Sequence, residues 1–296
     1  MHILTHEYFD RIQLFNIFLS YSAGFATYIT LGFMNSYPMN ICESNKAVSL
    51  EVLNFMQNVA DIKEESITDY LVWKWRELDK RFNYLSMKTF NHAVENVTTG
   101  ADFDLELWLV GSKTHVSLAV QAKKFIKPYD SYVKRLNYPN GTKHQLNTLL
   151  AYAATHNRLP FYFIYSVPGP QTTTMCRLPS HSDCGVFMAD ANVMKQFADG
   201  KHGKRASRDD LLSKSNPFHC MFCCPLGPRG SYFNEYFRHA AQDATARSNE
   251  VIPEYVRSLL AEDSDRLRDD GQARTLNNEE WSRFRAVGVY DLRNDA

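Results

Sequence analysis

The sequence predicts an α/β protein in which helices flank both faces of a mixed central sheet. The first observation is the order of the predicted elements, which run helix, strand, strand, helix, strand over residues 63–165. The second is a middle strand that is apolar at nearly every position, as expected for a strand buried on both faces. The third is size, because 296 residues with 44% hydrophobic side chains can bury a sizeable core.

Two helices are expected first, over residues 49–59 and 63–82. The second is the stronger prediction, because its apolar side chains recur at steps of three and four residues and so share one helical face: Ile67, Leu71, Trp75, Leu78 and Phe82. On this helix Glu64 falls on the same side as the first of these apolar residues, whereas Glu65 points away. Glu64 is therefore the acid expected to face the interior.

A β-hairpin is predicted over residues 103–110 and 116–122. In its first strand the apolar side chains recur at every second position: Phe103, Leu105, Leu107 and Leu109. Gly111 and Ser112 supply the turn. The second strand is almost wholly apolar, so we expect it at the centre of the sheet.

Later elements extend this core. We expect a helix over 143–154, strands over 161–165 and 185–188, a helix from about residue 191, an exposed polar loop with a short helix over 199–217, and a helix over 253–260. The chain is thereby divided into an apolar helical N-terminal extension (1–45), a core (46–168), a C-terminal α+β elaboration packed on the core (169–261) and a charged tail (262–296).

Charge and cysteine content restrict the cellular setting. Lys and Arg total 33, as do Asp and Glu, so only a local basic surface could favour a nucleic-acid partner. Six unevenly spaced cysteines and no evident secretory signal favour reduced thiols and a cytoplasmic location. Residues 14–34 are apolar, but five polar residues interrupt them. A buried helical layer is therefore favoured over a membrane or interfacial anchor, which stays open.

Two short motifs lie at one end of the predicted hairpin. Gly100-Ala101-Asp102 precedes the first strand, and Gln121-Ala122-Lys123 closes the second. A hairpin brings these ends together, so an acid, an amide oxygen and a lysine would share one edge of the sheet. Asp102 would hold a divalent cation, and Gln121 and the backbone carbonyl of Ala122 would add oxygen ligands. The Lys123 ammonium would contact the phosphate or orient the attacking water.

Further residues complete the predicted site. Glu64 would add a metal ligand from its helix, directly or through water, and Gln145 would support the site or touch substrate. A Lys- and Tyr-rich connection would line a phosphate-binding surface: Lys124, Lys127, Tyr129, Tyr132 and Lys134. Each assignment has a structural alternative. Glu64 would only favour the start of its helix, Gln145 would be a buried glutamine that ties down a loop, and the Lys- and Tyr-rich connection would be a solvated loop.

The sequence resembles the PD-(D/E)XK nuclease superfamily. Three segments carry the resemblance: Glu64-Glu65-Ser66-Ile67-Thr68-Asp69, Gly100-Ala101-Asp102 and Gln121-Ala122-Lys123. The Gln-x-Lys form is similar to the Mrr-like restriction endonuclease branch and to related antiphage effector nucleases. The resemblance covers about residues 60–166. It implies a restriction-endonuclease-like core, cleavage that depends on Mg²⁺ (or Mn²⁺), and usually a DNA substrate.

The resemblance assigns Asp102 to the acidic metal-binding position, and Gln121 and Lys123 to the variable third position and the lysine. The chain departs from the common pattern twice. Ala101 stands where proline is usual, and Gln121 stands where glutamate is usual, which lowers the expected metal affinity. Asp104 is the alternative acid if the strand register is shifted.

The sequence therefore predicts a metal-dependent endonuclease that cleaves double-stranded DNA, with antiphage defence as its setting and a second copy or a defence-system protein as partner. One rival is a catalytically inactive nucleic-acid-binding module on the same fold. A second is an RNase on that fold. A third, which rests on residues 14–34, is a membrane-tethered interaction protein.

Other chemistries find less support. The segment His219-Cys220-Met221-Phe222-Cys223-Cys224 contains a Cys-x-x-Cys pair that could form a zinc site with Cys176 and Cys184 or His181. Its apolar neighbours favour buried cysteines instead. The sequence contains no glycine-flanked nucleophile elbow, phosphate loop or dinucleotide fingerprint.

Overall fold

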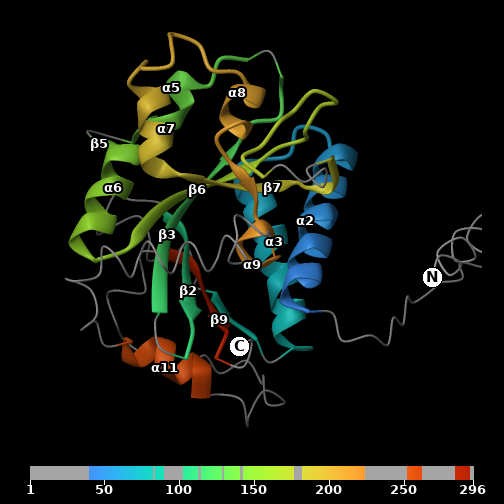
Figure 1. Cartoon of the computed structure of the whole chain (residues 1–296), viewed down its shortest axis with the longest axis vertical. Helices are drawn as coiled ribbons and strands as arrows, with labels where there is room; N and C mark the ends of the chain where they lie inside the picture. Colours follow the sequence, from blue (N-terminus) through green and yellow to red (C-terminus); the bar gives the residue numbers. More distant parts are fainter. Residues whose placement is uncertain are drawn as a thin grey trace, which may run out of the picture. The chain divides into compact units, whose positions relative to one another are not determined.

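A computed structural model has a seven-stranded mixed sheet with helices on both faces, as the sequence predicts (Figure 1). One face is covered by α2 (Ile41–Asn58) and α3 (Glu64–Asp79), and the other by α6 (Gln145–Thr155) and α7 (Ala191–Ala198). The structure describes residues 40–82, 84–89, 103–112, 115–128, 130–140, 143–176, 182–223, 252–261 and 284–293.

The strands lie in an order that differs from their order in the chain. Across the sheet they are β1 (Leu85–Thr89), β9 (Phe284–Asp291), β2 (Phe103–Val110), β3 (His115–Lys124), β6 (Leu159–Tyr165), β7 (Val186–Asp190) and β8 (Asn216–Pro217). Further described elements are the β4 (Pro139–Asn140) and β5 (Lys143–His144) pair and the short helices α5 (Val133–Leu136), α8 (Arg208–Leu212), α9 (Cys220–Cys223) and α11 (Glu254–Ala261).

The predicted hairpin is present. β2 and β3 pair antiparallel, with Leu105 opposite Val120. β3 then pairs parallel with β6, and α6 lies in the connection between these two strands. β3 is buried along most of its length, so its predicted central position is confirmed.

Strand β9 lies where a charged tail was expected. It pairs parallel with β2 and antiparallel with β1, so it occupies an interior position in the sheet. Ala286, Val289 and Tyr290 are fully buried. The expectation of a tail is therefore wrong for residues 284–291, while residues 262–283 lie outside the described part. Strand β1 was not predicted either.

The folded core begins earlier than the expected boundary at residue 45. The side-chain oxygen of Asn40 accepts a hydrogen bond from the Glu43 N–H at 2.9 Å and so caps α2. Buried Asn45 accepts from Trp75 Nε1 at 3.2 Å and from the Tyr290 hydroxyl at 2.7 Å, which joins α2 to α3 and β9. The boundary was wrong because α2 already begins at Ile41, whereas the apolar pattern predicts a helix only from residue 49.

The apolar segment 14–34 lies outside the described residues. Within the part of the chain that the structure describes, no helix has the length and apolar character needed to cross a membrane.

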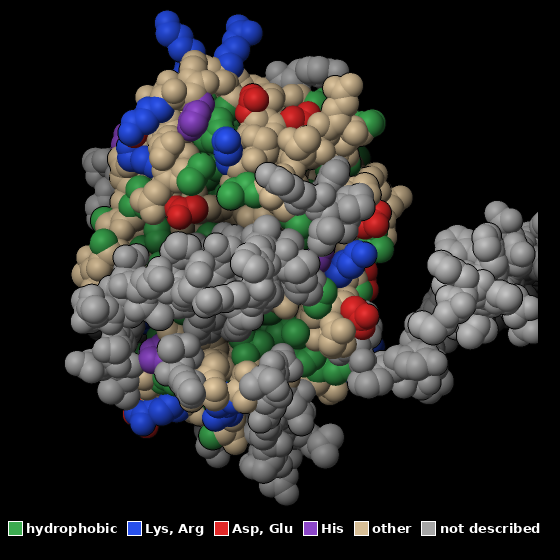
Figure 2. Space-filling view, viewed as in Figure 1, with side chains coloured by type: hydrophobic (Ala, Val, Ile, Leu, Met, Phe, Trp, Pro, Cys, Tyr) green, Lys and Arg blue, Asp and Glu red, His purple; other side chains and the backbone are tan. Residues whose placement is uncertain are grey.

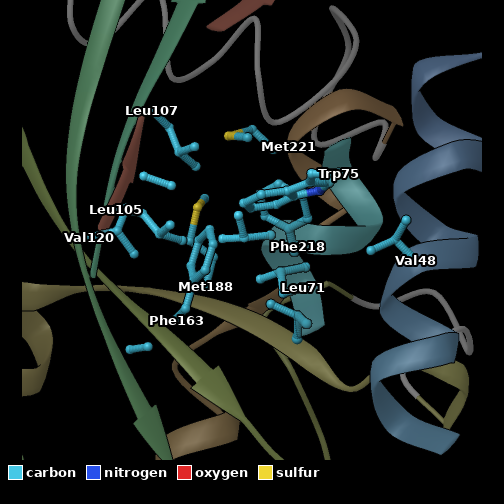
Figure 3. Packing of buried hydrophobic residues seen from close by; sticks show 14 of the residues in the cluster. Val48, Leu71, Trp75, Leu105, Leu107, Val120, Phe163, Met188, Phe218 and Met221 are labelled. Atoms are coloured by element: carbon cyan, nitrogen blue, oxygen red, sulfur yellow. The ribbon is translucent and has the colours of Figure 1, made fainter. Parts of the chain in front are cut away.

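Large side chains fill the space between the sheet and the α2–α3 layer (Figure 3). Trp75 of α3 is fully buried, and its ring centroid lies 6.2 Å from that of Phe163 and 5.4 Å from that of Phe218. Leu105 and Val120 meet this cluster from β2 and β3. Burying one such side chain contributes about 2–3 kcal/mol, so this packing holds α3, and Glu64 with it, against the sheet.

Helix α2 approaches the start of β7 closely at Gly185. The Gly185 N–H donates to the carbonyl of Ser49 at 3.0 Å. A Cβ atom on residue 185 would lie 2.4 Å from the backbone nitrogen of Leu53, so a larger residue would force the helix away. The C-terminal elaboration is thus joined to the core by this contact and by the continuation of the sheet into β7 and β8.

The described cysteines include buried thiols that form no disulfide: Cys176, Cys184 and Cys220. Burial raises the pKa of the Cys184 thiol to about 11. No group of three or more His, Cys, Asp or Glu side chains that could hold a metal occurs among the described residues, which do not include His181 or the Cys223 side chain. Cys42 is disulfide-bonded, so the expectation of reduced thiols is wrong for that residue.

His219 carries a prediction for stability against pH. Its side chain is 4% exposed, and burial, together with the charge of Lys46, lowers its pKa to about 4. In the unfolded chain the imidazole of His219 is protonated below about pH 6.5, whereas in the folded protein it is protonated only below about pH 4. Between these values the unfolded state binds more protons than the folded state, so the free energy of unfolding falls as pH falls. The full shift corresponds to about 3 kcal/mol.

Urea unfolding at about pH 7 and pH 4.5 should show a larger loss of stability for the wild type than for His219→Gln. Equal losses in the two proteins would contradict a buried, neutral imidazole.

Candidate functional site

Glu64, the first residue of α3, joins this helix to the end of β3. Its Oε1 accepts a hydrogen bond from Lys123 Nζ at 3.1 Å, and its Oε2 accepts from the backbone N–H of Lys124 at 2.7 Å. The ion pair is largely shielded, with 22% of the Glu64 side chain and 11% of the Lys123 side chain exposed. Glu65 is exposed, so the predicted inward orientation of Glu64 is confirmed.

Gln121 and Lys123 occupy alternate positions near the end of β3. The register places them beside Tyr162 and Ile164 of β6, whose side chains pack in the layer with α6. Gln121 is 3% exposed, and its Nε2 donates to the carbonyl of Ala122 at 3.4 Å. Since Glu64 comes from the helix layer on the opposite face, Lys123 connects the two faces at the end of the strand.

Asp102 lies outside the described residues. β2 begins at the next residue, Phe103, and its antiparallel pairing brings this end of β2 to the end of β3 that carries Gln121 and Lys123. Asp104 is part of β2, but its side chain is not described. The choice between the two acids therefore stays a prediction.

Gln145 begins α6 at the same edge of the sheet. Tyr162, the neighbour of Gln121, donates its hydroxyl to the carbonyl of Leu136 at 2.7 Å. Two residues further on, the carbonyl of Tyr138 accepts the backbone N–H of Gln145 at 3.1 Å. The side-chain oxygen of Gln145 is buried and accepts no hydrogen bond from any described residue. An acceptor in this state can receive a ligand without breaking an existing contact.

A hollow of about 570 Å³ opens beside this site, between the α2–α3 turn and the chain that follows β3. Lys124 and Lys127 both line it, and the phosphate-binding surface expected after the Gln-x-Lys motif stays a prediction. Lys124 also belongs to the site, because its backbone N–H reaches Glu64 and its ammonium donates to the carbonyl of Ile62. Lys124 is therefore shared by the hollow and by the contacts of Glu64.

Sequence reasoning missed Arg285, which lies at the start of β9 near the same edge. Its Nη2 donates to Asp69 Oδ2 at 3.2 Å, and its Nη1 donates to the carbonyl of Glu65 at 3.3 Å. Phe103 and Phe284 are paired, so the start of β9 lies beside the start of β2. Nothing in the local sequence signalled this cation, because its position depends on a pairing between distant segments.

The oxygen donors at this edge are of the type that Mg²⁺ prefers. They are the carboxylate of Glu64, the backbone carbonyl of Ala122 and the amide oxygens of Gln121 and Gln145. Both oxygens of Glu64 already accept N–H donors, so as a ligand it would share them with Lys123 and Lys124. Donors of this type suit a divalent cation, and the magnesium site, with Asp102 as its expected further carboxylate, stays a prediction.

A protein-family model described as a family of unknown function (DUF6615) matches residues 41–283 of the chain. The matched span begins with α2 and ends one residue before β9. Searches of the curated proteins and of the solved structures found no significant match.

Proposed function

We propose that this chain, which belongs to a family of unknown function (DUF6615), is a metal-dependent endonuclease that hydrolyses phosphodiester bonds in double-stranded DNA. The observation that carries the proposal is the 3.1 Å contact between Glu64 of α3 and Lys123 of β3. A helix acid and a strand lysine come together at the edge where β2 begins, directly after Asp102. This contact supports the proposal because it joins the first and third motifs beside the strand that follows the second.

Lys123 would neutralise negative charge on the scissile phosphate. Its ammonium is largely shielded from water, so its interaction with a developing negative charge is stronger than it would be in bulk solvent. Glu64 holds the ammonium in place before substrate arrives, which lowers the cost of orienting it during the reaction.

The groups that would hold Mg²⁺ (or Mn²⁺) are Asp102, Glu64, Gln121 and the carbonyl of Ala122. When bound, the ion supplies Lewis-acid polarisation of the phosphate and of the attacking water. The unpaired oxygen of Gln145 and the cations Lys124 and Lys127 would orient the substrate strand around it. A role in antiviral defence and association with a second copy or a defence-system partner belong to the same proposal and rest on the resemblance of the motifs. A cytoplasmic location also belongs to it and rests on the uneven spacing of the cysteines.

The test is cleavage of supercoiled plasmid by the full chain with Mg²⁺, with Mn²⁺ and with EDTA. Wild-type protein should nick or linearise the plasmid only when a metal is added, and Asp102→Ala should lower the rate by about a hundredfold or more. Asp183→Ala serves as the control, because Asp183 is an exposed acid on a separate turn.

The rivals give different outcomes in the same assay. Wild-type protein that binds DNA but never cuts it with either metal would contradict the nuclease and favour the inactive binding module. Faster cleavage of a matched RNA duplex would favour the RNase.

A further inference from the structure

Two loops that are far apart in the chain are joined beside the candidate site. Tyr132, in the connection after β3, is 1% exposed, and its backbone N–H donates to the carbonyl of Ala206 at 2.8 Å. Its hydroxyl donates to the carbonyl of Lys127 at 2.7 Å. The buried Tyr132 therefore connects the segment after β3 to the segment between α7 and α8.

The joined segments carry a strong excess of positive charge. Residues 124–135 and 201–206 contain seven Lys or Arg residues and one acid, Asp130, in a chain whose total charge is balanced. Most of these cations are exposed, and they form no ion pair with any residue in the described ranges: Lys127, Lys134, Arg135, Lys201, Lys204 and Arg205. Figure 2 shows blue side chains gathered at the upper end of the molecule, where Figure 1 places α5 and the loop between α7 and α8.

The excess charge begins inside the candidate site. Lys124 contacts Glu64 through its backbone N–H, and the hollow that Lys124 lines is also lined by Lys127 and Arg135. Arg135 lies over the ring of Tyr132, with its guanidinium carbon 5.6 Å from the ring centroid. Cations thus line the hollow beside the Glu64 and Lys123 pair, and the hydrogen bond from Tyr132 to Ala206 brings the segment that carries Lys204 and Arg205 to the same part of the chain.

We infer that these two segments form one binding surface for the phosphate backbone of a DNA duplex. The inference rests on the nuclease function proposed for the adjoining site. Exposed Lys and Arg side chains without ion-pair partners bind DNA favourably, because they replace and release its condensed counterions. Their contacts with phosphate oxygens carry no sequence information. The surface accordingly positions duplexes of any sequence across the site.

The chain offers three matched Lys-Arg pairs for the test: Lys134-Arg135 and Lys204-Arg205 on the proposed surface, and the exposed Lys80-Arg81 just after the end of α3 remote from Glu64. Each pair is replaced by Ala-Ala in the full chain. Binding of a fluorescent DNA duplex of random sequence is measured by anisotropy in EDTA, over salt concentrations from about 50 to 200 mM.

Loss of two phosphate contacts should reduce the slope of log K against log salt by about 2, because each contact contributes about 0.9. We expect this reduction for K134A/R135A and for K204A/R205A, with affinity at low salt weakened by about tenfold or more. K80A/R81A should match the wild type. Lys201→Glu is a second variant on the same loop, and charge reversal there should weaken binding more than Lys201→Ala does.

Identical behaviour of K204A/R205A and K80A/R81A would overturn the proposed surface, as would a wild type that binds no duplex. Tighter binding of an RNA duplex or of single-stranded DNA would overturn the assignment to duplex DNA. Because binding is measured in EDTA, it is separate from cleavage. A wild type that binds through these residues but never cuts with Mg²⁺ would refute the nuclease and leave this surface standing.

Discussion

Replacing Lys123 by alanine is expected to lower the rate of DNA cleavage by about a hundredfold to a thousandfold. Removal of one preorganised group that stabilises transition-state charge has an effect of this size, about 3–4 kcal/mol. Lys123 fits the role because its ammonium is held at 3.1 Å from Glu64 and only 11% of its side chain is exposed. The loss should appear in single-turnover rates of plasmid nicking, where binding and product release do not limit the rate.

The matched control is Lys63→Ala, which removes the same charge one residue before Glu64. Lys63 is exposed, and its side chain makes no capping hydrogen bond to α3. We expect this variant to cut at the wild-type rate. Equal rates for the Lys123 and Lys63 variants, with both proteins folded, would remove Lys123 from the mechanism.

Glu64→Gln separates two roles for the acid. Glutamine can still accept the N–H of Lys124, so the end of β3 should stay in place. If Glu64 is also a metal ligand, the Mg²⁺ concentration for half-maximal rate should rise by about tenfold or more. An unchanged Mg²⁺ requirement would limit Glu64 to positioning Lys123.

Elements that depend on local pattern were predicted well. The alternation of leucines gave β2 its observed bounds, and the apolar run of β3 placed it at the centre of the sheet. Helical periodicity also indicated Glu64 as the inward acid of α3, and the structure brings this residue to Lys123 at the end of β3.

Elements that depend on distant pairing were not predicted. β9 follows a long charged segment, and Gly288 in its middle weakens its apolar signal. A Cβ at this position would lie 2.7 Å from Met87 Sδ, so a larger residue would require the Met87 side chain to move. Arg285 was missed for the same reason, and the N–H of Lys124 was missed because backbone donors leave no trace in a residue pattern.

Replacing Arg158 by methionine is expected to lower the free energy of unfolding by about 3–5 kcal/mol. Arg158 Nε donates to Glu106 Oε1 at 2.8 Å, and 8% and 2% of the two side chains are exposed. The Tyr255 hydroxyl donates to the other Glu106 oxygen at 2.9 Å, so the same carboxylate ties α11 to β2. Loss of the guanidinium leaves a buried carboxylate without its cation. In thermal unfolding the midpoint should fall by roughly 10 °C or more.

Adding Glu106→Gln to the Arg158→Met protein should restore part of this stability. The amide is neutral, and it can still accept the hydroxyl of Tyr255. The double variant should therefore be more stable than Arg158→Met alone, although each substitution is destabilising by itself. Simple addition of the two losses would mean that the charges are not coupled.

The pH dependence distinguishes an unpaired charge from lost packing. Burial raises the pKa of Glu106, and the charge of Arg158 lowers it by a smaller amount. A carboxyl whose pKa is higher in the folded state favours folding as pH falls, and this contribution is lost as pH rises through the folded pKa. Without Arg158 the pKa rises further, so the deficit of Arg158→Met relative to wild type should shrink between about pH 7.5 and pH 5. Because the volume removed is the same at every pH, a deficit that stays constant would assign the loss to packing alone.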